Sequence, residues 1–530
     1  MNHRDELILA NLIANRVDTQ PNLDVLTFIY IDSEGKIKEE VRSYQQLWDN
    51  AQRIAAGLNA LGLKPGQSFA LLMQNHPEVV ESMIAASITG TIFVPIDPRV
   101  QGYKLKYMLE FSECHGVICA DYALDNLYSV KSHLPSLNWV IQLDTGIQRS
   151  QNKLKLNIKE ILDGEVPALP ILSQDPDAPM QMLYTSGTTG DPKAILSSHR
   201  RFGDVVSLGT FLGMQENDRP YTGLSLTHAN AQLLTLGVAL KMGLRAVISR
   251  KFTKSRLWDI TRQYGCTVFN LLGGMTTALF SEPAKPNDAD NPVRYVLSAG
   301  MPTAVWDDFK QRFGVEIFEI YGAAEGGLTL NPLGLGPVGS IGKAPPTLEV
   351  RIVDEEDNEC PRGTAGEIIF RNADGSAPKV TYFKNEEASH KKVSKGWLRM
   401  DDIGHMDEDN WLYFHYRKGG GIRRNGDFVN TAFVEKVVSE NAQVSDVYVY
   451  GVPAASGAPG EKDIVAAIVA EPGIKFDADA LFTACKDKLE ANFVPTYLQL
   501  VDEIPKTASE KPQERFLLEL FDTQSQRVFS

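Results

Sequence analysis

The sequence predicts an α/β protein: a large multilayer N-terminal domain with parallel sheets and a β-rich subdomain, followed by a small, mobile α+β C-terminal domain. Short β-branched runs alternate with helix-like stretches over roughly the first 400 residues, which is typical of parallel sheets covered by helices. The segment from about 340 to 415 instead alternates strand-like pieces with turns. Three consecutive glycines at 419–421 then form a joint with little conformational preference.

The individual elements follow one another at even spacing. A short amphipathic helix is expected near the N-terminus, where Leu7, Leu9, Leu12 and Ile13 recur. The pattern then predicts a strand, a helix, a strand, a helix and a strand, at 69–73, 77–89, 92–96, 103–112 and 116–120. Further strands are expected at 245–249, 267–270, 295–298 and 316–319.

The domain boundaries follow from this pattern. We expect an N-terminal domain over 1–418, with a β-rich subdomain at about 340–415 whose strands include 348–353 and 367–370. Residues 419–421 are predicted to be a hinge, and 422–530 a C-terminal lid domain. The elements expected in the lid are a helix, two strands and a helix, at 432–440, 447–450, 464–469 and 478–489.

Composition excludes several classes of protein. The chain has 530 residues, of which 43% are hydrophobic and 23% charged, and this rules out a collagen-like, a wholly disordered or a coiled-coil chain. The formal net charge of −14 disfavours nucleic acid as a partner, because surfaces that bind nucleic-acid phosphates are normally basic. It does not forbid a local pocket for a small anion.

Cysteines and apolar runs indicate the compartment. The five cysteines are scattered, so buried thiols in a reducing compartment are expected rather than a zinc site. Acidic residues precede any apolar run at the N-terminus, unlike in a secretory signal. The longest uncharged stretch, 220–240, carries polar side chains near its middle and is predicted to be buried interior. We therefore expect a cytoplasmic protein without a transmembrane segment.

The strongest local feature is a loop of small residues between Tyr184 and Lys193. The loop contains Thr185, Ser186, Gly187, Thr188, Thr189 and Gly190, followed by Asp191 and Pro192. Small residues let the backbone approach an anion, and their N–H and hydroxyl groups can surround phosphate oxygens. Lys193 adds a positive charge. The spacing differs from that of a Walker A motif, so a different type of phosphate loop is indicated.

Five segments, in order along the chain, resemble the motifs of one family. They are 184–193, 320–325, 397–404, the positions Arg417, Ile422, Arg423 and Gly426, and 505–511. The family is the acyl-adenylate-forming superfamily, which comprises acyl-CoA synthetases, peptide-synthetase adenylation domains and beetle luciferases. Within it, the chain looks closest to crotonobetaine/carnitine-CoA ligase-like enzymes and to diterpenoid- or steroid-acid CoA ligases.

The resemblance implies an ATP-dependent acid–CoA ligase. A carboxylate would attack the α-phosphate of ATP to give an acyl-AMP, and the thiol of CoA would then displace AMP. Lys511 is the implied catalytic residue that reaches the carboxylate and the α-phosphate together. Glu325, Thr185 and His228 are the other expected catalytic residues, and the hydroxyl of Thr185 or Thr188 would assist Glu325 at the metal. Glu325 and Thr188 are the implied ligands of Mg²⁺, an ion that prefers hard oxygen ligands.

The remaining nucleotide contacts are also implied by the resemblance. Tyr321 resembles the aromatic residue that stacks on adenine, and 298–300 would lie along the other side of the base. Asp402 would accept the ribose hydroxyls, and Arg417 would assist at the ribose or phosphate. The nucleotide and CoA contacts expected besides these and the phosphate loop are Ser298, Ala299, Gly300, Gly322, Ala324, Arg424 and Gly426.

Four sites depart from the family pattern. Ala324 stands in place of a threonine, Met400-Asp401 in place of Thr-Gly, Gly420 or an adjacent glycine in place of the hinge aspartate, and Glu510 in place of a glycine. Glu510 puts a negative charge beside Lys511, which is expected to weaken the pull of this lysine on anions. Gly420 is expected to ease the domain rotation. None of these changes removes the catalytic lysine, the metal carboxylate or the ribose carboxylate, so an active enzyme is expected.

The acid is expected to bind around His228. This residue is the candidate gate of the acyl pocket, with a purely structural histidine as an equal alternative, and Asn230 lies close to it in the chain. Gly273, Gly274 and Met275 should line the same pocket, where the two glycines leave space for a bulky or long acyl group. No acidic residue in these segments is available to bind an amino group, which disfavours an amino acid as substrate.

Two alternatives stay open at this point. The protein could load an acyl group onto a carrier protein instead of CoA, or it could bind a nucleotide without catalysis, given the four departures. The expected partners are a small-molecule carboxylic acid, ATP and CoA, and a homodimer is left open. The sequence does not identify the acid.

Overall fold

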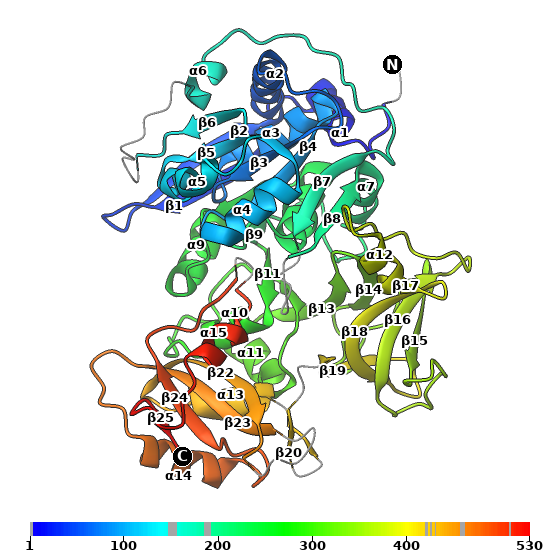
Figure 1. Ribbon diagram of the computed structural model, residues 1–530. Helices are drawn as coiled ribbons and strands as arrows, with labels where there is room; N and C mark the ends of the chain where they lie inside the picture. Colours follow the sequence, from blue (N-terminus) through cyan, green and yellow to red (C-terminus); the bar gives the residue numbers. More distant parts are fainter. Residues whose placement is uncertain are drawn as a thin grey trace. The chain divides into compact units, whose positions relative to one another are not determined.

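The computed structural model describes residues 4–146, 156–184, 192–418, 422–424, 427–429, 431–455, 462–507 and 510–530. Contacts within the chain divide it into two compact units. The first unit comprises 1–253, 259–270 and 380–390, and the second comprises 254–258, 271–379 and 391–530. The helices and strands of each unit can be found by their labels in Figure 1.

The first unit holds the N-terminal elements. They are α1 (Leu9–Thr19), β1 (Asp24–Ile31), β2 (Ile37–Ser43), α2 (Tyr44–Ala60), β3 (Ser68–Leu72), α3 (Pro77–Thr89), β4 (Ile92–Ile96), α4 (Gly102–Phe111), β5 (Cys114–Ala120), η1 (Asp121–Ala123), α5 (Leu124–Lys131), β6 (Trp139–Leu143) and α6 (Ile158–Leu162). They continue as β7 (Pro179–Tyr184), β8 (Ala194–Ser198), α7 (His199–Val206), β9 (Pro220–Thr222), η2 (Asn230–Gly237), α8 (Val238–Met242) and β10 (Ala246–Ser249). Next come η3 (Lys254–Arg256), α9 (Leu257–Tyr264) and β11 (Val268–Leu272), along which the chain passes between the units.

One six-stranded sheet of this unit has the order β6-β5-β3-β4-β7-β8. All neighbouring strands are parallel except β7 and β8, which pair antiparallel. Both β3 and β4 are buried at every residue. Strands covered on both faces read as continuous apolar runs, and this is why the sequence predicted them closely.

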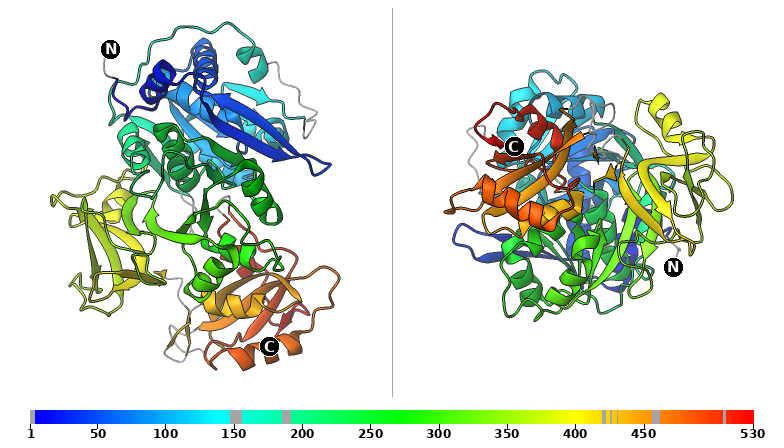
Figure 2. Two further views of the ribbon diagram at one scale, coloured as in Figure 1. Left: turned by 180° about the vertical axis from the view of Figure 1, so that it is seen from behind. Right: turned by 90° about the horizontal axis from the view of Figure 1, so that it is seen from below.

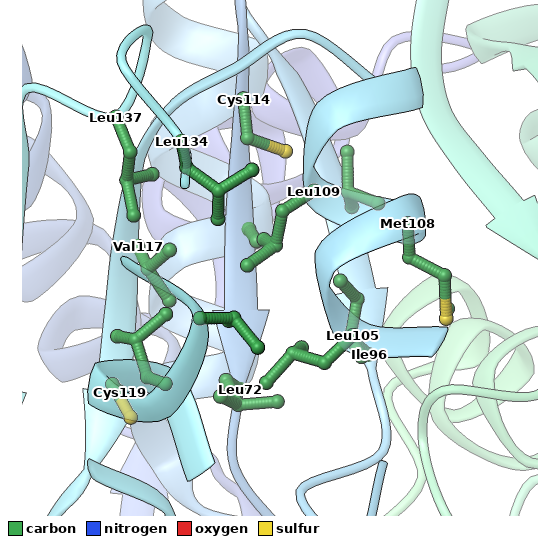
Figure 3. Packing of buried hydrophobic residues seen from close by; sticks show 14 of the residues in the cluster. Leu72, Ile96, Leu105, Met108, Leu109, Cys114, Val117, Cys119, Leu134 and Leu137 are labelled. Atoms are coloured by element: carbon green, nitrogen blue, oxygen red, sulfur yellow. The ribbon is translucent and has the colours of Figure 1, made fainter. Parts of the chain in front are cut away.

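Helices α4 and α5 cover one face of this sheet. Figure 3 shows Leu105 and Leu109 of α4 directed toward Leu72 of β3 and Val117 of β5. These side chains belong to one buried cluster that also includes residues of β4, β6, β7, β8 and α5. The predicted layers of parallel strands and helices are therefore confirmed in this unit.

Helix α3 is buried along its whole length, which is unusual for a helix in a protein of ordinary composition. Pro77 lies in the first turn, where its missing N–H costs nothing, and Gly90 ends the helix with a left-handed φ of 68°. These two residues explain why the predicted span of 77–89 coincides with the observed helix.

A second group of strands in the first unit has the order β11-β9-β10-β1-β2. Here β9 pairs parallel with β10 and β11, β10 pairs parallel with β1, and β2 runs antiparallel to β1. The buried Asn75 connects α3 to this group, because its amide donates to the carbonyl oxygens of Leu224 and Ser249, both at 2.8 Å. Its own oxygen accepts from the N–H of Leu226, also at 2.8 Å.

The uncharged stretch 220–240 is largely interior, as predicted, but its local structure was not anticipated. It contains β9, the π-helix η2 and the start of α8. Gln232 and Thr235 of η2 are fully buried. π-Helical segments are rare and occur frequently at functional sites, and their apolar pattern does not distinguish them from an α-helix.

After η3, the second unit continues with α10 (Gly273–Phe280) and contains strands of two sheets before residue 418. Its further elements there are β12 (Tyr295–Ala299), η4 (Thr303–Val305), α11 (Trp306–Phe313), β13 (Glu316–Ala323), β14 (Gly326–Asn331), β15 (Leu348–Val353), β16 (Gly366–Asn372), β17 (Val393–Ser394), β18 (Trp397–Met406) and β19 (Leu412–Arg417). Helix α12 (Glu386–Lys392) begins in the first unit and ends in the second. β12 pairs parallel with β13, and β14 returns antiparallel along β13. β15, β16, β18 and β17 form an antiparallel sheet in that order, with β19 on β18. The strands predicted at 348–353 and 367–370 are thus confirmed.

The last part of the second unit has its own sheet and core. Its elements are β20 (Arg423–Arg424), β21 (Asp427–Phe428), α13 (Thr431–Ser439), β22 (Val444–Pro453), β23 (Lys462–Ala470), α14 (Ala478–Lys488), β24 (Tyr497–Val501), α15 (Glu514–Glu519) and β25 (Val528–Phe529). The sheet order is β22-β23-β24-β25, drawn in orange and red in Figure 2. Residues of α13, α14, β22, β23 and β24 share one buried cluster. The helix–strand–strand–helix order predicted from the sequence is confirmed.

Two whole-chain properties bear on function. Across the described ranges, no helix combines the length and apolar character that crossing a bilayer requires. The five cysteines are all buried free thiols.

We expect Gly116→Ala to destabilise the protein. A Cβ at this position of β5 would lie 2.0 Å from the ring of Trp139, directly opposite on β6. Overpacking of this kind costs about 1–3 kcal/mol of unfolding free energy. Denaturant unfolding of Gly116→Ala should show this loss, and most of it should vanish when the same change is made in a Trp139→Ala background. An equal loss in both backgrounds would contradict the steric explanation.

Candidate active site

Asp402 and Arg417, two residues expected at the nucleotide, lie opposite each other in the second unit. Asp402 of β18 pairs directly with Arg417 of β19, and the arginine Nε lies 3.6 Å from the aspartate Oδ1. The Asp402 side chain is only 12% exposed, whereas that of Arg417 is 55% exposed. The pair therefore places a buried carboxylate beside a cation that reaches solvent.

Tyr321 joins this pair from β13. Its hydroxyl donates a hydrogen bond of 2.6 Å to Oδ2 of Asp402. The ring stacks near Phe370, with centroids 6.4 Å apart and an interplanar angle of 24°. Burial and the Asp402 charge both raise the pKa of the Tyr321 hydroxyl, so it remains a proton donor at neutral pH.

Burial raises the pKa of the Asp402 carboxyl, and several neighbours oppose this effect. The opposing groups are the hydroxyl of Tyr321 and the positive charges of Arg417, Lys392 and Lys511. Removing any one of them would raise the pKa further, because each stabilises the ionised form.

Lys511 belongs to the same constellation. Its side chain keeps contact with solvent, but the density of protein around it and the charge of Arg417 lower the pKa of its ammonium group. The carboxylates of Asp402 and Glu325 oppose that shift. The chain around Lys511 is closed by two hydrogen bonds, from the N–H of Thr507 to the Lys511 carbonyl at 2.8 Å and from the N–H of Lys511 to the Thr507 hydroxyl at 3.2 Å. The structure thus brings the predicted lysine, ribose aspartate, arginine and metal carboxylate into one electrostatic group.

The predicted adenine segment 298–300 lies at the end of β12, and the structure reveals a residue beside it that sequence reasoning missed. Glu319 of β13 is almost fully buried and its carboxylate accepts from the N–H groups of Gly300 and Met301, at 2.5 and 3.2 Å. Burial raises the pKa of the Glu319 carboxyl to about 7, against the two backbone N–H groups and the nearby hydroxyl of Ser298, which lower it. The only sequence signal was an acidic residue inside an apolar strand.

The glycines predicted to line the acyl pocket make close backbone approaches. A Cβ at Gly273 would lie 2.8 Å from the carbonyl oxygen of Gly300, and one at Gly274 would lie 3.1 Å from that of Glu510. The carbonyl of Gly300 therefore leaves no room for a side chain at position 273, and the carbonyl of Glu510 leaves little at position 274. Met275 is buried at 1% exposure. The acyl-pocket role of these residues stays a prediction.

Two of the departures from the family pattern share one conformation. Asp401 and Glu510 have φ values of 59° and 58°, in the left-handed region that favours glycine. An L-residue with a Cβ pays roughly 1–2 kcal/mol there, somewhat less for aspartate. Both residues thus adopt a conformation that glycine would adopt more easily. Ala324 and Gly322 lie at the turn and strand end beside Glu325 and Tyr321.

The predicted sites in the first unit lie apart in the chain from this group. The phosphate-loop residues Thr185 to Gly190 lie outside the described residues, as do two predicted sites of the second unit, the hinge 419–421 and Gly426. Lys193 lies just beyond the loop, with its Nζ 5.3 Å from the ring centre of Tyr382. Asn230 accepts a hydrogen bond of 2.7 Å from the amide of Asn270 at the first turn of η2.

His228 and Arg424 have surroundings that the sequence did not predict. The backbone N–H of His228 donates to the carbonyl of Ser225, and the residue lies two positions beyond Leu226, which Asn75 holds. The guanidinium of Arg424 donates to the carbonyl of Val494 at 2.5 Å. It also lines a cavity of about 490 Å³ with residues of α14 and the segment 491–496.

The comparisons with known proteins agree with this geometry. The family model of the AMP-binding enzymes matches residues 14–377, and that of the AMP-binding enzyme C-terminal domain matches 434–511. Medium/long-chain-fatty-acid–CoA ligase FadD17 of Mycobacterium marinum is 28% identical over 84% of this chain and 85% of its own length. Crotonobetaine/carnitine–CoA ligase of Salmonella heidelberg is 26% identical over 92% of this chain and 95% of its own length.

Solved structures show the same fold. The anthranilate CoA ligase AuaEII, in complex with anthranoyl-AMP, superposes with a TM-score of 0.82 at 22% identity and 96% coverage of both chains. A benzoate CoA ligase from Burkholderia xenovorans LB400 superposes with a TM-score of 0.78 at 22% identity, covering 96% of this chain and 99% of its own. The chain therefore belongs to the AMP-binding enzyme family, and its predicted place in the acyl-adenylate-forming superfamily is confirmed.

Tyr321→Phe should weaken nucleotide binding. The change removes the hydrogen bond to Asp402, which raises the pKa of this carboxyl and leaves a buried acceptor unsatisfied, at a cost of about 1–3 kcal/mol. We expect a 5- to 100-fold higher Kd for AMP by calorimetry. Tyr413→Phe, which removes a 3.3 Å contact to Asp407, is the control and should bind AMP as wild type does. Equal binding by all three proteins would contradict the role of the hydroxyl.

Glu319→Gln should change the pH dependence of stability. The folded-state pKa of Glu319 lies above its ordinary value of 4.5, so this group favours folding most at low pH and loses that contribution as pH rises toward 7. Glutamine keeps an acceptor oxygen but does not ionise. Relative to wild type, the variant should therefore gain unfolding free energy between about pH 5 and 7.5, by at most about 3 kcal/mol. A difference independent of pH would mean that Glu319 does not titrate in this window.

Proposed function

We propose that this chain is an ATP-dependent carboxylic acid–CoA ligase that forms an acyl-adenylate and then an acyl-CoA thioester. The chain is an AMP-binding enzyme, and the relatives that match most of its length are acid–CoA ligases. It therefore falls in the AMP-forming acid–thiol ligase class. The observation that carries the proposal is the electrostatic group of Lys511, Asp402, Arg417 and Glu325. A reaction between two anions requires this combination of cations with a hydroxyl-binding and a metal-binding carboxylate.

In the first step a carboxylate oxygen attacks the α-phosphorus of ATP, and the bond to pyrophosphate breaks. Lys511 supplies positive charge between the two anions, and loss of one such donor typically slows a reaction by about 10²–10³. Its lowered pKa still leaves the amine able to hold a proton, since Asp402 and Glu325 favour the ammonium form. Asp402, oriented by Tyr321, accepts from the ribose hydroxyls.

Glu325 fits a role as the protein ligand of Mg²⁺. The described residues contain no group of three or more His, Cys, Asp or Glu side chains arranged around a metal site. An ion bound together with ATP needs only one or two carboxylates besides phosphates and water, so Glu325 alone meets the requirement for a protein carboxylate. The second ligand implied by the sequence, Thr188, lies outside the described residues. The ion would neutralise phosphate charge during the attack.

In the second step the sulfur of CoA attacks the acyl carbonyl and AMP leaves. The two steps need different surroundings, and we propose that residues 422–530 rotate about 419–421 between them. One contact supports a distinct pose for the first step. Lys436 of α13 donates to the carbonyl of Ala304 at 2.6 Å and to Asp308 at 3.1 Å, while Lys511 lies among the site residues.

A bulky or long-chain acid is the proposed substrate. The segments 226–232 and 272–275 carry no charged side chain apart from His228, which suits an uncharged acyl group. The relatives named above act on medium- and long-chain fatty acids and on crotonobetaine or carnitine, by their names. A panel of carboxylic acids mixed with ATP, Mg²⁺ and CoA, read by mass detection of thioesters, identifies the substrate class.

The same panel decides the alternatives. Pyrophosphate release with any acid separates an enzyme from a nucleotide-binding protein without catalysis. Thioester formation with CoA or with a holo-carrier protein then separates the two acceptors. If no acid in a panel spanning short, long, aromatic and polycyclic members releases pyrophosphate, the ligase proposal is wrong.

Lys511→Ala should abolish adenylate formation selectively. We expect pyrophosphate release to fall by about 10²–10³ or more, because the charge between the two anions is lost. Thioester formation from supplied acyl-adenylate should stay within a few-fold of wild type. Lys475→Ala, at an exposed loop lysine of the same C-terminal segment, is the control and should leave both rates unchanged. Near-wild-type rates for Lys511→Ala in both half-reactions would refute its assigned role.

Lys436→Met should slow adenylate formation several-fold and leave thioester formation from supplied adenylate unchanged. Its contacts with Ala304 and Asp308 belong to the pose that holds Lys511 in the site. Asp308→Asn tests the ionic part of this contact and should act in the same direction more weakly. A uniform effect on both half-reactions would argue against a pose-specific contact.

A further inference from the structure

Lys392 is a buried lysine close to the nucleotide site that no family motif includes. It ends α12, and its side chain is only 9% exposed. Its ammonium group lies 2.7 Å from Oδ2 of Asp401, the residue that precedes the ribose aspartate. A buried ammonium is costly unless it is paired, so the contact with Asp401 is required for Lys392 to occupy this place.

Asp401 lies at a distortion of β18. Glu367 and Ile369 of β16 pair with Ile403 and Arg399, so two steps along β16 face four along β18. Residues 400–402 therefore form a bulge, and Asp401 takes its φ of 59° there. Bulges redirect the side chains next to them, and here the adjacent side chain is that of Asp402.

The backbone on the other side of Asp401 is also held. Its carbonyl accepts from the N–H of Lys418 at 2.8 Å, just after Arg417. The left-handed conformation disfavours any residue with a Cβ, so an additional interaction is needed to keep it. Among the described residues, Lys392 donates a side-chain hydrogen bond to the Asp401 carboxylate, whereas Arg417 and Lys418 act on it only through their charge.

We propose that Lys392 is a positioning residue: its ion pair with Asp401 fixes the left-handed bulge and thereby aims the Asp402 carboxylate at the nucleotide. The proposal rests on the proposed function, in which Asp402 binds the ribose. Together, Asp401 and the Lys392 that binds it would maintain the backbone conformation that a glycine could adopt alone. Each residue alone is then a liability, because Lys392 without Asp401 is a buried unpaired charge and Asp401 without Lys392 is a strained residue without its anchor.

This reciprocity defines a test with four proteins: wild type, Lys392→Met, Asp401→Gly and the double variant. Calorimetry gives the Kd for AMP, and thermal unfolding without nucleotide gives the stability of each protein. Lys392→Met should raise the Kd for AMP about 5- to 20-fold and lower the melting temperature. Asp401→Gly alone should also lower the melting temperature. The double variant should return to within about 2-fold of the wild-type Kd, because glycine adopts the bulge without the ion pair.

Lys391→Met is the matched control, because Lys391 is the exposed neighbour on the same helix. It should behave as wild type in both measurements. With an acid substrate in hand, Lys392→Met should raise KM for ATP and leave KM for the acid within 2-fold, a split that a general loss of structure would not produce.

The proposal would be overturned if the two single changes lowered AMP affinity and melting temperature additively in the double variant. It would also be overturned if Lys392→Met bound AMP as wild type does. If wild type itself binds no AMP, the proposed function fails instead. The coupling between Lys392 and Asp401 in the melting temperatures still decides in that case whether the pair holds the bulge.

Discussion

The carboxylate of Asp402 is the point at which three strands of the second unit meet. A buried carboxylate is unfavourable unless hydrogen bonds and positive charge replace the lost water. Here the hydroxyl of Tyr321 comes from β13 and the guanidinium of Arg417 from β19, while Asp402 itself stands on β18. The ends of β13 and β19 must therefore lie beside β18 if the Asp402 carboxylate is to be hydrogen-bonded and paired with positive charge. The carboxylates of Asp402 and Glu325 also favour the charged form of Lys511, which links the lysine to this arrangement.

The site shows that backbone shape and residue type are separable requirements. Asp401 and Glu510 each precede a residue with a proposed direct contact to the reactants, and each adopts a conformation that glycine would adopt more easily. A Cβ in this conformation makes the folded state less favourable by an amount comparable to one good hydrogen bond. Both positions therefore depend on their surroundings to maintain a geometry that glycine would supply unaided.

The sequence predicted the fold well where the chain carries strong local signals. Helix α3 was placed correctly because Pro77 and Gly90 mark its ends, and β4 because both of its faces are apolar. Tyr321, Asp402, Arg417 and Lys511 were predicted from the sequence because each lies in a short string of residues that resembles a family motif, and their roles stay predictions.

Other features depended on tertiary contacts that no local pattern encodes. Glu319 acquires its role only when β12 pairs with β13 and brings the N–H groups of Gly300 and Met301 to its carboxylate. In the sequence, Lys392 is one of several charged residues of a polar helix, and its pairing with Asp401 is seen only in the folded structure. The π-helix η2 has the apolar periodicity of an ordinary buried helix, so its geometry is set by packing.

The burial of the cysteines has a practical consequence for studying the reaction. Burial raises the pKa of every one of the five thiols, so at neutral pH they are almost wholly protonated and enclosed. Thiol-reactive dyes need an accessible thiolate. In a mixture with CoA they should therefore react with the CoA thiol and not with the folded protein. On unfolding, all five thiols become exposed, so labelling of the protein by the dye should increase. One reagent can thus follow thioester formation in the folded enzyme and mark the loss of its structure.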